Sequence, residues 1–421
     1  MPLPPDTQIV IAGAGPHGLA MTIHCLVAAP HLRDRITVVD PSGQWLRTWR
    51  DQFARLEISH LRSPGVHHPG VRPEALMKHT RAHDLPTSGL PYGLPMTEAF
   101  SHFCDDLIKE HDLASFVVRG EMIDVHCDEQ QTCRVTIATG EQHTMLPNSR
   151  LIIASNPHRP NIPPCAHSLD DDVLRLGHQV DIRQLGDLTG TNVVVVGGGL
   201  TAAHLACGAA EHGASVTLAS RDGLRESPFD TDPGWLGPKE LRAFDEIDDP
   251  SERLRTAMAA RNGGTIPPWM FERLEGCSNA ITILEHAEVA SVASTADQVW
   301  LATGTAPSIE AMPALDRLRD RIPSVDGYPV PGADLTLADL PIHVTGRLAT
   351  IELGPAAGNL WGAQRAAERI SHSLTGIDLR LEFHPIVLHQ RPDAPPTHSP
   401  SQPSQPSQPS QPSQPSQGSQ P

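Results

Sequence analysis

The stretch that decides the fold is IVIAGAGPHGLA, residues 9–20. Its apolar start predicts a buried strand, and the glycine-rich turn after it predicts a change from strand to helix. In the pattern G-x-G-x-x-G, Gly13 makes the tight turn, Gly15 lets a diphosphate approach the backbone, and Gly18 lets the helix pack closely on the strand. The helix amino terminus then holds the diphosphate through unpaired N–H groups and the helix dipole.

A second unit has the same layout but a different ending. VVVVGGGLTAAHLA, residues 193–206, carries Gly197 and Gly199 in the first two positions and Ala202 in the third, an accepted variant. The strand after the first turn ends in Asp40, which can accept hydrogen bonds from ribose hydroxyls and would repel a 2′-phosphate. The strand after the second turn ends in Ser220 and Arg221, which could bind such a phosphate. Arg221 as a solvated surface arginine is the alternative.

Composition narrows the class of protein. The 421 residues include 49 Asp and Glu against 32 Lys and Arg, a net charge of −17, and no basic cluster, so nucleic acid is not an expected partner. No apolar run is long enough to span a membrane. Seven cysteines without a C-x-x-C motif indicate reduced thiols and a cytoplasmic protein. No metal site is expected, since His67 and His68 are more typical of a loop.

The layout resembles flavoproteins with two dinucleotide-binding domains, and in particular the class B flavin monooxygenases that hydroxylate the amine of lysine or ornithine. DQVWLATG, residues 297–304, fits that branch's D-x-x-x-L-A-T-G signature, and residues 49–64 resemble the segment that passes the flavin and reaches the substrate. Residues 151–156 and 299–304 resemble the two crossings between domains. Residues 343–367 resemble the closing flavin segment.

The resemblance implies an α/β fold of two Rossmann-like domains, with the NADPH domain inserted into the FAD domain and a small antiparallel meander attached. Residues 1–165 and 301–390 would form the FAD domain, residues 166–300 the NADPH domain, and residues 391–421 a disordered Ser-Gln-Pro tail. Proteins of this architecture often associate, so a homo-oligomer stays open.

The resemblance also assigns residues to the two cofactors. Arg62 stands where the branch has the lysine that grips the substrate carboxylate, although a surface arginine or a flavin-phosphate contact stays open. Glu57 replaces a glutamine near the flavin, or it caps a short helix. The expected cofactor-binding residues are Gly13, Gly15, Pro16, His17, Gly18, Asp40, Trp49, Glu57, Leu353, Gly354, Pro355 and Asn359 for FAD, Gly197, Gly199, Leu200, Thr201, Ala202, Ser220 and Arg221 for NADPH, and Thr303 and Gly304 at a crossing.

The implied activity is oxygenation of an amine or amino acid by O2 through a C4a-hydroperoxyflavin formed with FAD and NADPH. No acid–base pair or nucleophile motif is present, because the flavin would carry the chemistry, and no catalytic residue is assigned. An FAD-dependent NADPH oxidase or reductase, and a nucleotide-binding regulator without turnover, are the alternatives. Disulphide reductases are not favoured, because no redox cysteine motif occurs in the sequence.

Overall fold

The computed structural model describes residues 8–128, 132–164, 166, 173–287, 292–293 and 296–379. The expected disordered tail, residues 391–421, lies outside these ranges. Among the described residues, no helix combines the length and the apolar character that crossing a membrane requires.

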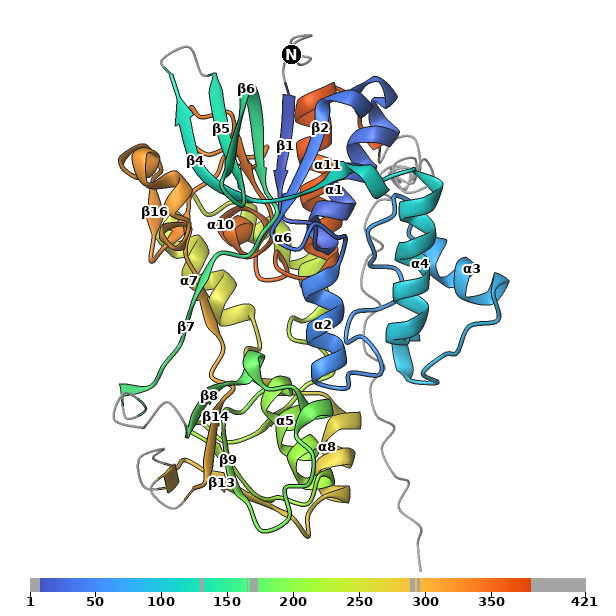
Figure 1. Cartoon of the computed structure of the whole chain (residues 1–421), viewed down its shortest axis with the longest axis vertical. Helices are drawn as coiled ribbons and strands as arrows, with labels where there is room; N and C mark the ends of the chain where they lie inside the picture. Colours follow the sequence, from blue (N-terminus) through green and yellow to red (C-terminus); the bar gives the residue numbers. More distant parts are fainter. Residues whose placement is uncertain are drawn as a thin grey trace, which may run out of the picture. The chain divides into compact units, whose positions relative to one another are not determined.

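The first sheet has seven strands, in which a parallel layer continues into an antiparallel meander (Figure 1). The parallel layer has the order β3–β2–β1–β6–β18, and β4 and β5 pair antiparallel beyond β6. The strand bounds are β1 Gln8–Ala12, β2 Ile36–Asp40, β3 Val117–Arg119, β4 Glu121–Cys127, β5 Cys133–Thr139, β6 Gln142–Ile153 and β18 Ile342–Val344.

Strand β6 joins the two parts of this sheet because it is long enough to serve both. Its first part pairs with β5 from Gln142 onward, and its last residues, 149–153, pair with β1. The end of the strand is also its buried part, since residues 149 and 151–153 are buried. The expected meander and the expected buried strand are therefore one continuous element.

The second sheet is parallel throughout, in the order β13–β10–β9–β14–β8. All of its strands fall between β6 and β18 in sequence, so it is inserted into the first. Valines fill β9, as expected of a strand covered on both faces. The bounds are β8 Leu174–Leu176, β9 Asn192–Val196, β10 Ser215–Ser220, β13 Ile281–Glu285 and β14 Gln298–Leu301.

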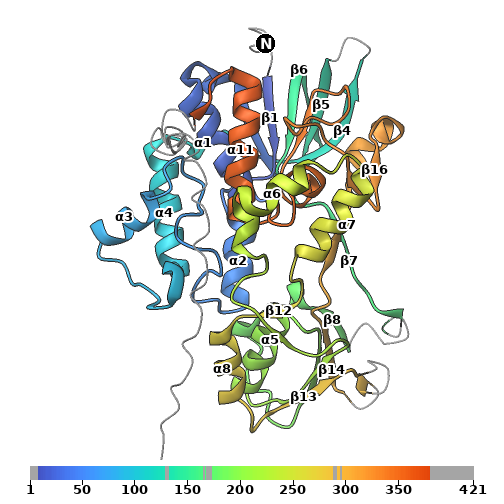
Figure 2. The same ribbon diagram turned by 180° about the vertical axis from the view of Figure 1, so that it is seen from behind.

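Helices cover both sheets. On the first sheet α1 lies beside α11, as both views show (Figures 1 and 2). On the second sheet α5 packs against β10 and α8. The helix bounds are α1 Pro16–Ala28, α2 Arg47–Arg55, α3 Ala75–Ala82, α4 Thr97–Glu110, α5 Leu200–Glu211, α6 Pro238–Asp245, α7 Pro250–Ala260, α8 Pro268–Gly276, α10 Thr350–Leu353 and α11 Leu360–Thr375.

Six short strands form three further pairs outside the two large sheets. The crossing segments pair as β7 with β15, and the remaining pairs are β11 with β12 and β16 with β17. Their bounds are β7 His158–Pro160, β11 Arg225–Glu226, β12 Thr265–Ile266, β15 Thr305–Pro307, β16 Ser324–Val325 and β17 Tyr328–Pro329.

The inserted helices α6 and α7 are anchored to the closing segment of the chain. Arg253 of α7 donates hydrogen bonds to the carbonyls of Ile351 and Glu352 and lies 3.3 Å from the Glu352 carboxylate. Its guanidinium also stacks 4.6 Å from the Phe244 ring. The α/β class, the two Rossmann-like sheets and the meander are confirmed, while the domain boundaries stay a prediction.

Candidate functional site

The first glycine turn leaves open space where a diphosphate would approach. Gly13 has φ of 114°, and a Cβ there would lie 2.7 Å from the Ser155 backbone nitrogen. A Cβ on Gly18 would lie 2.0 Å from the Gly13 carbonyl oxygen, so helix and strand meet here as closely as the pattern predicts. Gly15, the residue that caps the amino terminus of α1 ahead of Pro16, has nothing within 4 Å of such an atom.

Asp40 lies at the end of β2, beside this turn. One oxygen of its carboxylate accepts a hydrogen bond from the Ala14 N–H at 3.0 Å, and the other accepts one from the Ser42 N–H at 2.9 Å. Asp40 therefore shapes the glycine turn, and its contact with a ribose stays a prediction.

Three buried polar atoms around the first turn have no hydrogen-bond partner: Nδ1 of His17, Oγ of Ser155 and Nε of Arg347. Burial lowers the pKa of the His17 imidazole to about 4, although a hydrogen bond with the Gly358 backbone opposes the shift. A buried polar atom without a partner costs about 1–3 kcal/mol. A polar ligand in this cradle would remove that cost, so these residues fit a dinucleotide.

The closing segment presents the amino terminus of α11. The Asn359 side chain caps this helix by accepting a hydrogen bond from the Gly362 N–H at 3.0 Å. Leu353, Gly354 and Pro355 are buried, and a Cβ on Gly354 would lie 3.6–3.8 Å from Leu241, Phe244 and Trp235. The inserted helices thus cover Gly354, and only the end of the segment near Asn359 stays accessible.

The second glycine turn has the same backbone shape but is more enclosed. Gly197 has φ of 149°, Leu200 and Thr201 open α5, and Ala202 is fully buried. A Cβ on Gly199 would lie 3.0 Å from Cα of Gly264. Because Gly264 fills the space that stays open at Gly15, a diphosphate at the second turn requires the segment around Gly264 to shift.

The residues expected at the 2′-phosphate point in different directions. Ser220 is 3% exposed, and its hydroxyl donates to the Gly223 carbonyl at 3.0 Å. The Arg221 side chain is 89% exposed and forms an ion pair of 2.9 Å with Asp222. Arg221 is therefore accessible to a phosphate but is already paired, whereas Ser220 is turned into the protein.

Thr303 and Gly304 join the two crossings between the sheets. The Thr303 hydroxyl donates to the Asn161 carbonyl, and the Asn161 N–H donates to the Gly304 carbonyl at 3.1 Å. Arg347 also donates to Thr305, to its hydroxyl at 2.9 Å and its carbonyl at 2.8 Å. These contacts give Thr303 and Gly304 a structural role in addition to any contact with a cofactor.

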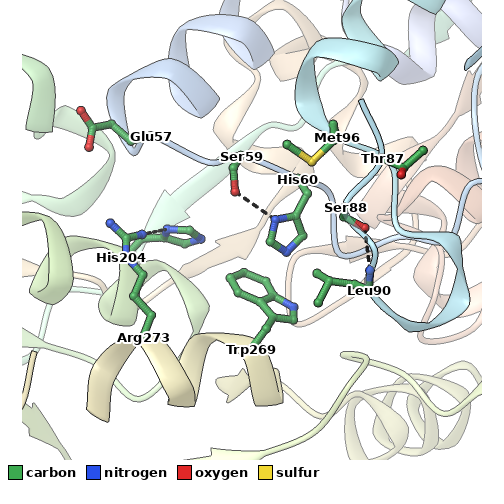
Figure 3. Close-up of a pocket in the computed structure, with 10 residues that line it drawn as sticks. All are labelled: Glu57, Ser59, His60, Thr87, Ser88, Leu90, Met96, His204, Trp269 and Arg273. Carbon is green, nitrogen blue, oxygen red and sulfur yellow. Dashed lines mark hydrogen bonds between the residues drawn. The ribbon is translucent and has the colours of Figure 1, made fainter. Parts of the chain in front are cut away.

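A cavity of about 560 Å³ lies between the segment after α2 and the second sheet's helices (Figure 3). That volume suits a small ligand. Three polar side chains, which sequence reasoning missed, reach it from α5 and α8: His204, Trp269 and Arg273. The opposite wall consists of Glu57, Ser59, His60, Thr87, Ser88, Leu90 and Met96.

Three nitrogens at this cavity are buried without a partner: Nε2 of His60, Nε2 of His204 and Nε1 of Trp269. Burial lowers the pKa of His60, and burial together with Arg273 and His60 lowers that of His204 to about 3, so both imidazoles are neutral at pH 7. Arg273 binds the Glu211 carboxylate through Nε and one terminal nitrogen, and its other terminal nitrogen lies 3.5 Å from His204.

The structure places Arg62 against backbone carbonyls rather than at this cavity. Its guanidinium donates to the carbonyls of Ser227 at 2.7 Å, Pro228 at 3.1 Å and Thr265 at 3.2 Å, and to the Thr265 hydroxyl at 2.8 Å. Arg62 thus ties its segment to the inserted part of the chain, and substrate binding by Arg62 stays a prediction.

The structure also describes the surroundings of Trp49 and Glu57, the aromatic and the acidic residue expected near the flavin. Trp49 is half-buried and stacks against Phe53 and Phe100, with ring centroids 4.1 Å and 5.1 Å away. Glu57 is exposed, follows α2 with φ of 51°, and lines the cavity. Their contacts with a flavin stay predictions.

The expectation that every cysteine is a thiol is wrong for Cys127 and Cys133, which form a disulphide. The β4–β5 register sets them opposite each other with Cα atoms 4.1 Å apart, which spacing in the sequence alone does not reveal. Cys133 is level with the first residues of β1, through Ser149. The first glycine turn follows the other end of β1, so the disulphide does not lie at that turn.

Comparisons with solved structures find a similar fold in several proteins. Ornithine hydroxylase from Pseudomonas aeruginosa matches with a TM-score of 0.69 and 17% identity, over 88% of this chain and 98% of that one. The ornithine N-hydroxylase from Kutzneria sp. 744, solved with reduced FAD, NADP+ and L-ornithine, matches with 0.69 and 14%, over 88% and 99%. L-lysine 6-monooxygenase from Pseudomonas syringae matches with 0.64 and 18%, over 87% and 98%.

These low identities show a shared fold. A search of curated protein sequences found no match. Residues 8–233, more than half of the 421 residues, match the sequence profile described as pyridine nucleotide-disulphide oxidoreductase. With its two glycine turns, one after β1 and one after β9, the chain belongs to the pyridine nucleotide-disulphide oxidoreductase family.

Proposed function

We propose that this protein is an FAD- and NADPH-dependent monooxygenase that hydroxylates an amine nitrogen of an amino-acid-like small molecule. The observation that carries the proposal is the pair of glycine turns, one after β1 and one after β9, in a fold shared with ornithine and lysine hydroxylases. A cytoplasmic location and a homo-oligomer stay predictions.

FAD fits the first turn. Its diphosphate would bind at the amino terminus of α1 over Gly15, and its ribose near Asp40. The flavin end would give partners to the buried polar atoms of His17 and Arg347. When bound, FAD supplies hydride acceptance from NADPH and reaction with O2, while the chain binds and orients the partners.

NADPH would occupy the second turn, in the domain expected over residues 166–300. Arg221 is the accessible cation at the end of β10. Binding would move the segment at Gly264 and would compete with Asp222 for Arg221, so we expect the second site to be less ready for its ligand than the first.

The substrate would bind in the cavity of Figure 3. The terminal nitrogen of Arg273 that faces His204, together with the unpartnered N–H of Trp269, suits a carboxylate. Glu57 on the opposite wall suits an ammonium group. We therefore propose Arg273, in place of Arg62, for the contact with the substrate carboxylate.

The test supplies the FAD-loaded protein with NADPH, O2 and a panel of amines and amino acids that includes ornithine, lysine and cadaverine. We expect NADPH oxidation to rise with one substrate, and mass spectrometry to find a product heavier by one oxygen atom. NADPH oxidation that yields only hydrogen peroxide with every substrate would refute oxygenation and favour the oxidase alternative. Bound FAD without NADPH oxidation would favour the regulator.

A matched pair of variants tests the pocket. Arg273→Gln should raise KM for the substrate by about tenfold, the loss of one charged hydrogen bond, with little change in KM for NADPH. Arg255→Gln, at an exposed position on α7, is the control and should change neither value. An unchanged KM for the substrate in Arg273→Gln would show that Arg273 does not bind the substrate.

A further inference from the structure

A cluster of imidazoles and one carboxylate lies between α3 and α4, which run side by side in both views (Figures 1 and 2). His79 lies in the last turn of α3, and His83 ends the helix four residues later. His102 and Asp106 have the same four-residue spacing on α4. Residues four apart share a helix face, so each helix turns one pair toward the other.

Three ligand atoms face one another in this cluster. Oδ2 of Asp106 lies 3.8 Å from Nδ1 of His79 and 3.6 Å from Nε2 of His83, and all three atoms lie within 4.8 Å of one another. Zinc bonds of about 2.0–2.2 Å in a tetrahedral site set neighbouring ligand atoms about 3.4 Å apart. Small side-chain rotations would therefore bring the three atoms onto one ion.

The orientation of His79 is fixed by its neighbours. Its Nε2 lies 2.9 Å from Nδ1 of His102, and its ring packs against the edge of Phe103 with centroids 5.3 Å apart. When Nε2 carries the proton and donates to His102, the lone pair of Nδ1 points toward Asp106. Metal-binding histidines commonly donate their other N–H to such a partner, which sets tautomer and ring orientation.

We propose that His79, His83 and Asp106 bind a divalent transition metal ion such as Zn²⁺, and that His102 is a positioning residue for His79. Two imidazoles and one carboxylate suit Zn²⁺ and its neighbours, whereas Mg²⁺ and Ca²⁺ favour oxygen ligands alone. His83 and Asp106 have half-exposed side chains, at 46% and 43%, so solvent can supply the remaining ligands.

A bound ion would act on the cavity described above. The segment from residue 84 to residue 96 runs from the end of α3 to the start of α4 and carries Thr87, Ser88 and Leu90 of the cavity wall. An ion held by both helices joins the two ends of this segment and restricts its motion. The site thus offers a means by which metal can stabilise one wall of the cavity.

The experiment uses the full, untagged chain after removal of metal with a chelator. Zn²⁺ titration by calorimetry, and Co²⁺ titration followed by visible absorption, should each reach one equivalent. His83→Gln and Asp106→Asn should weaken Zn²⁺ binding at least about tenfold, while His126→Ala, an exposed histidine on β4, should bind as the wild type does. Circular dichroism in chelator should show all variants folded.

Two results would overturn the proposal: no stoichiometric Zn²⁺ binding by the wild type, or Zn²⁺ affinity in His83→Gln and Asp106→Asn that equals that of the wild type. His102→Ala should weaken binding less than His83→Gln does, and a larger loss would make His102 a ligand instead of a positioning residue. Amide hydrogen exchange of residues 84–96 should slow on addition of Zn²⁺ in the wild type and in His126→Ala, but not in His83→Gln or Asp106→Asn. Unchanged exchange with bound Zn²⁺ would refute the link to the cavity wall.

Discussion

Alanine substitution of Gly15 should separate cofactor binding from folding. Gly15 has φ of −76°, which any residue adopts, and no atom lies within 4 Å of a Cβ added there. The methyl group therefore adds no clash to the protein without its cofactor. Its only cost is the poorer capping of α1 by alanine than by glycine, up to about 1 kcal/mol of unfolding free energy.

The same methyl group should displace the FAD diphosphate, since it would stand where the diphosphate meets the backbone. Loss of one charged hydrogen bond costs about 1.5–3 kcal/mol, which is about a 10- to 100-fold rise in the FAD dissociation constant. Gly237→Ala is the matched control, because Gly237 also caps a helix ahead of a proline and also has open space around it.

The assay is FAD titration of apoprotein by flavin fluorescence, with thermal unfolding measured without FAD. We expect Gly15→Ala and Gly237→Ala to unfold at similar temperatures, and only Gly15→Ala to lose FAD affinity. Equal FAD affinity in the two variants would show that no diphosphate approaches Gly15. Gly18→Ala should instead destabilise the apoprotein by about 1–3 kcal/mol or more, because its Cβ would lie 2.0 Å from the Gly13 carbonyl oxygen.

Four further predictions follow from named contacts. Arg221→Ala should raise KM for NADPH by about tenfold but leave KM for NADH unchanged. Asp222→Ala removes the ion-pair partner of Arg221 and should lower KM for NADPH. Equal effects on both coenzymes would show that Arg221 does not bind the 2′-phosphate. Arg62→Ala should lower the unfolding free energy by at least about 1.5 kcal/mol and leave KM for the substrate unchanged. A higher KM for the substrate at unchanged stability would show that Arg62 binds the substrate. Burial lowers the pKa of His24 from about 6.5 to about 4, so at intermediate pH the unfolded chain binds a proton that the folded chain does not bind. The free energy of unfolding should therefore fall as the pH drops from about 6.5 to about 4. His24→Gln should reduce this dependence of the unfolding free energy on pH by about 1.4 kcal/mol per pH unit in denaturant titrations, and an unchanged dependence would contradict the prediction. Cys127→Ser with Cys133→Ser should cost about 2 kcal/mol, the loop-closure value for so short a loop, in denaturant unfolding without reductant, with FAD affinity intact.

The sequence by itself determined the two dinucleotide turns and the class of fold. Strand, turn and helix are contiguous there, and backbone contacts decide the residue types: Gly18 must be glycine because the Gly13 carbonyl leaves no room for a Cβ. Such contacts arise within a few residues of chain, so they can be read before the rest of the molecule is known. The resemblance to two-domain flavoproteins implied that the second sheet is inserted into the first, and the strand order of the structure confirms it.

Only the tertiary structure decided which side chains meet. The direction of Ser220, the contacts of Arg62 and the Cys127–Cys133 pair depend on strand register and on packing between distant segments. The cavity joins residues 57–60 and 87–96 to α5 and α8, and the metal cluster joins α3 to α4. The four-residue spacing of the histidines is visible in the sequence, but which helix faces which is set by burial of apolar surface across the whole fold.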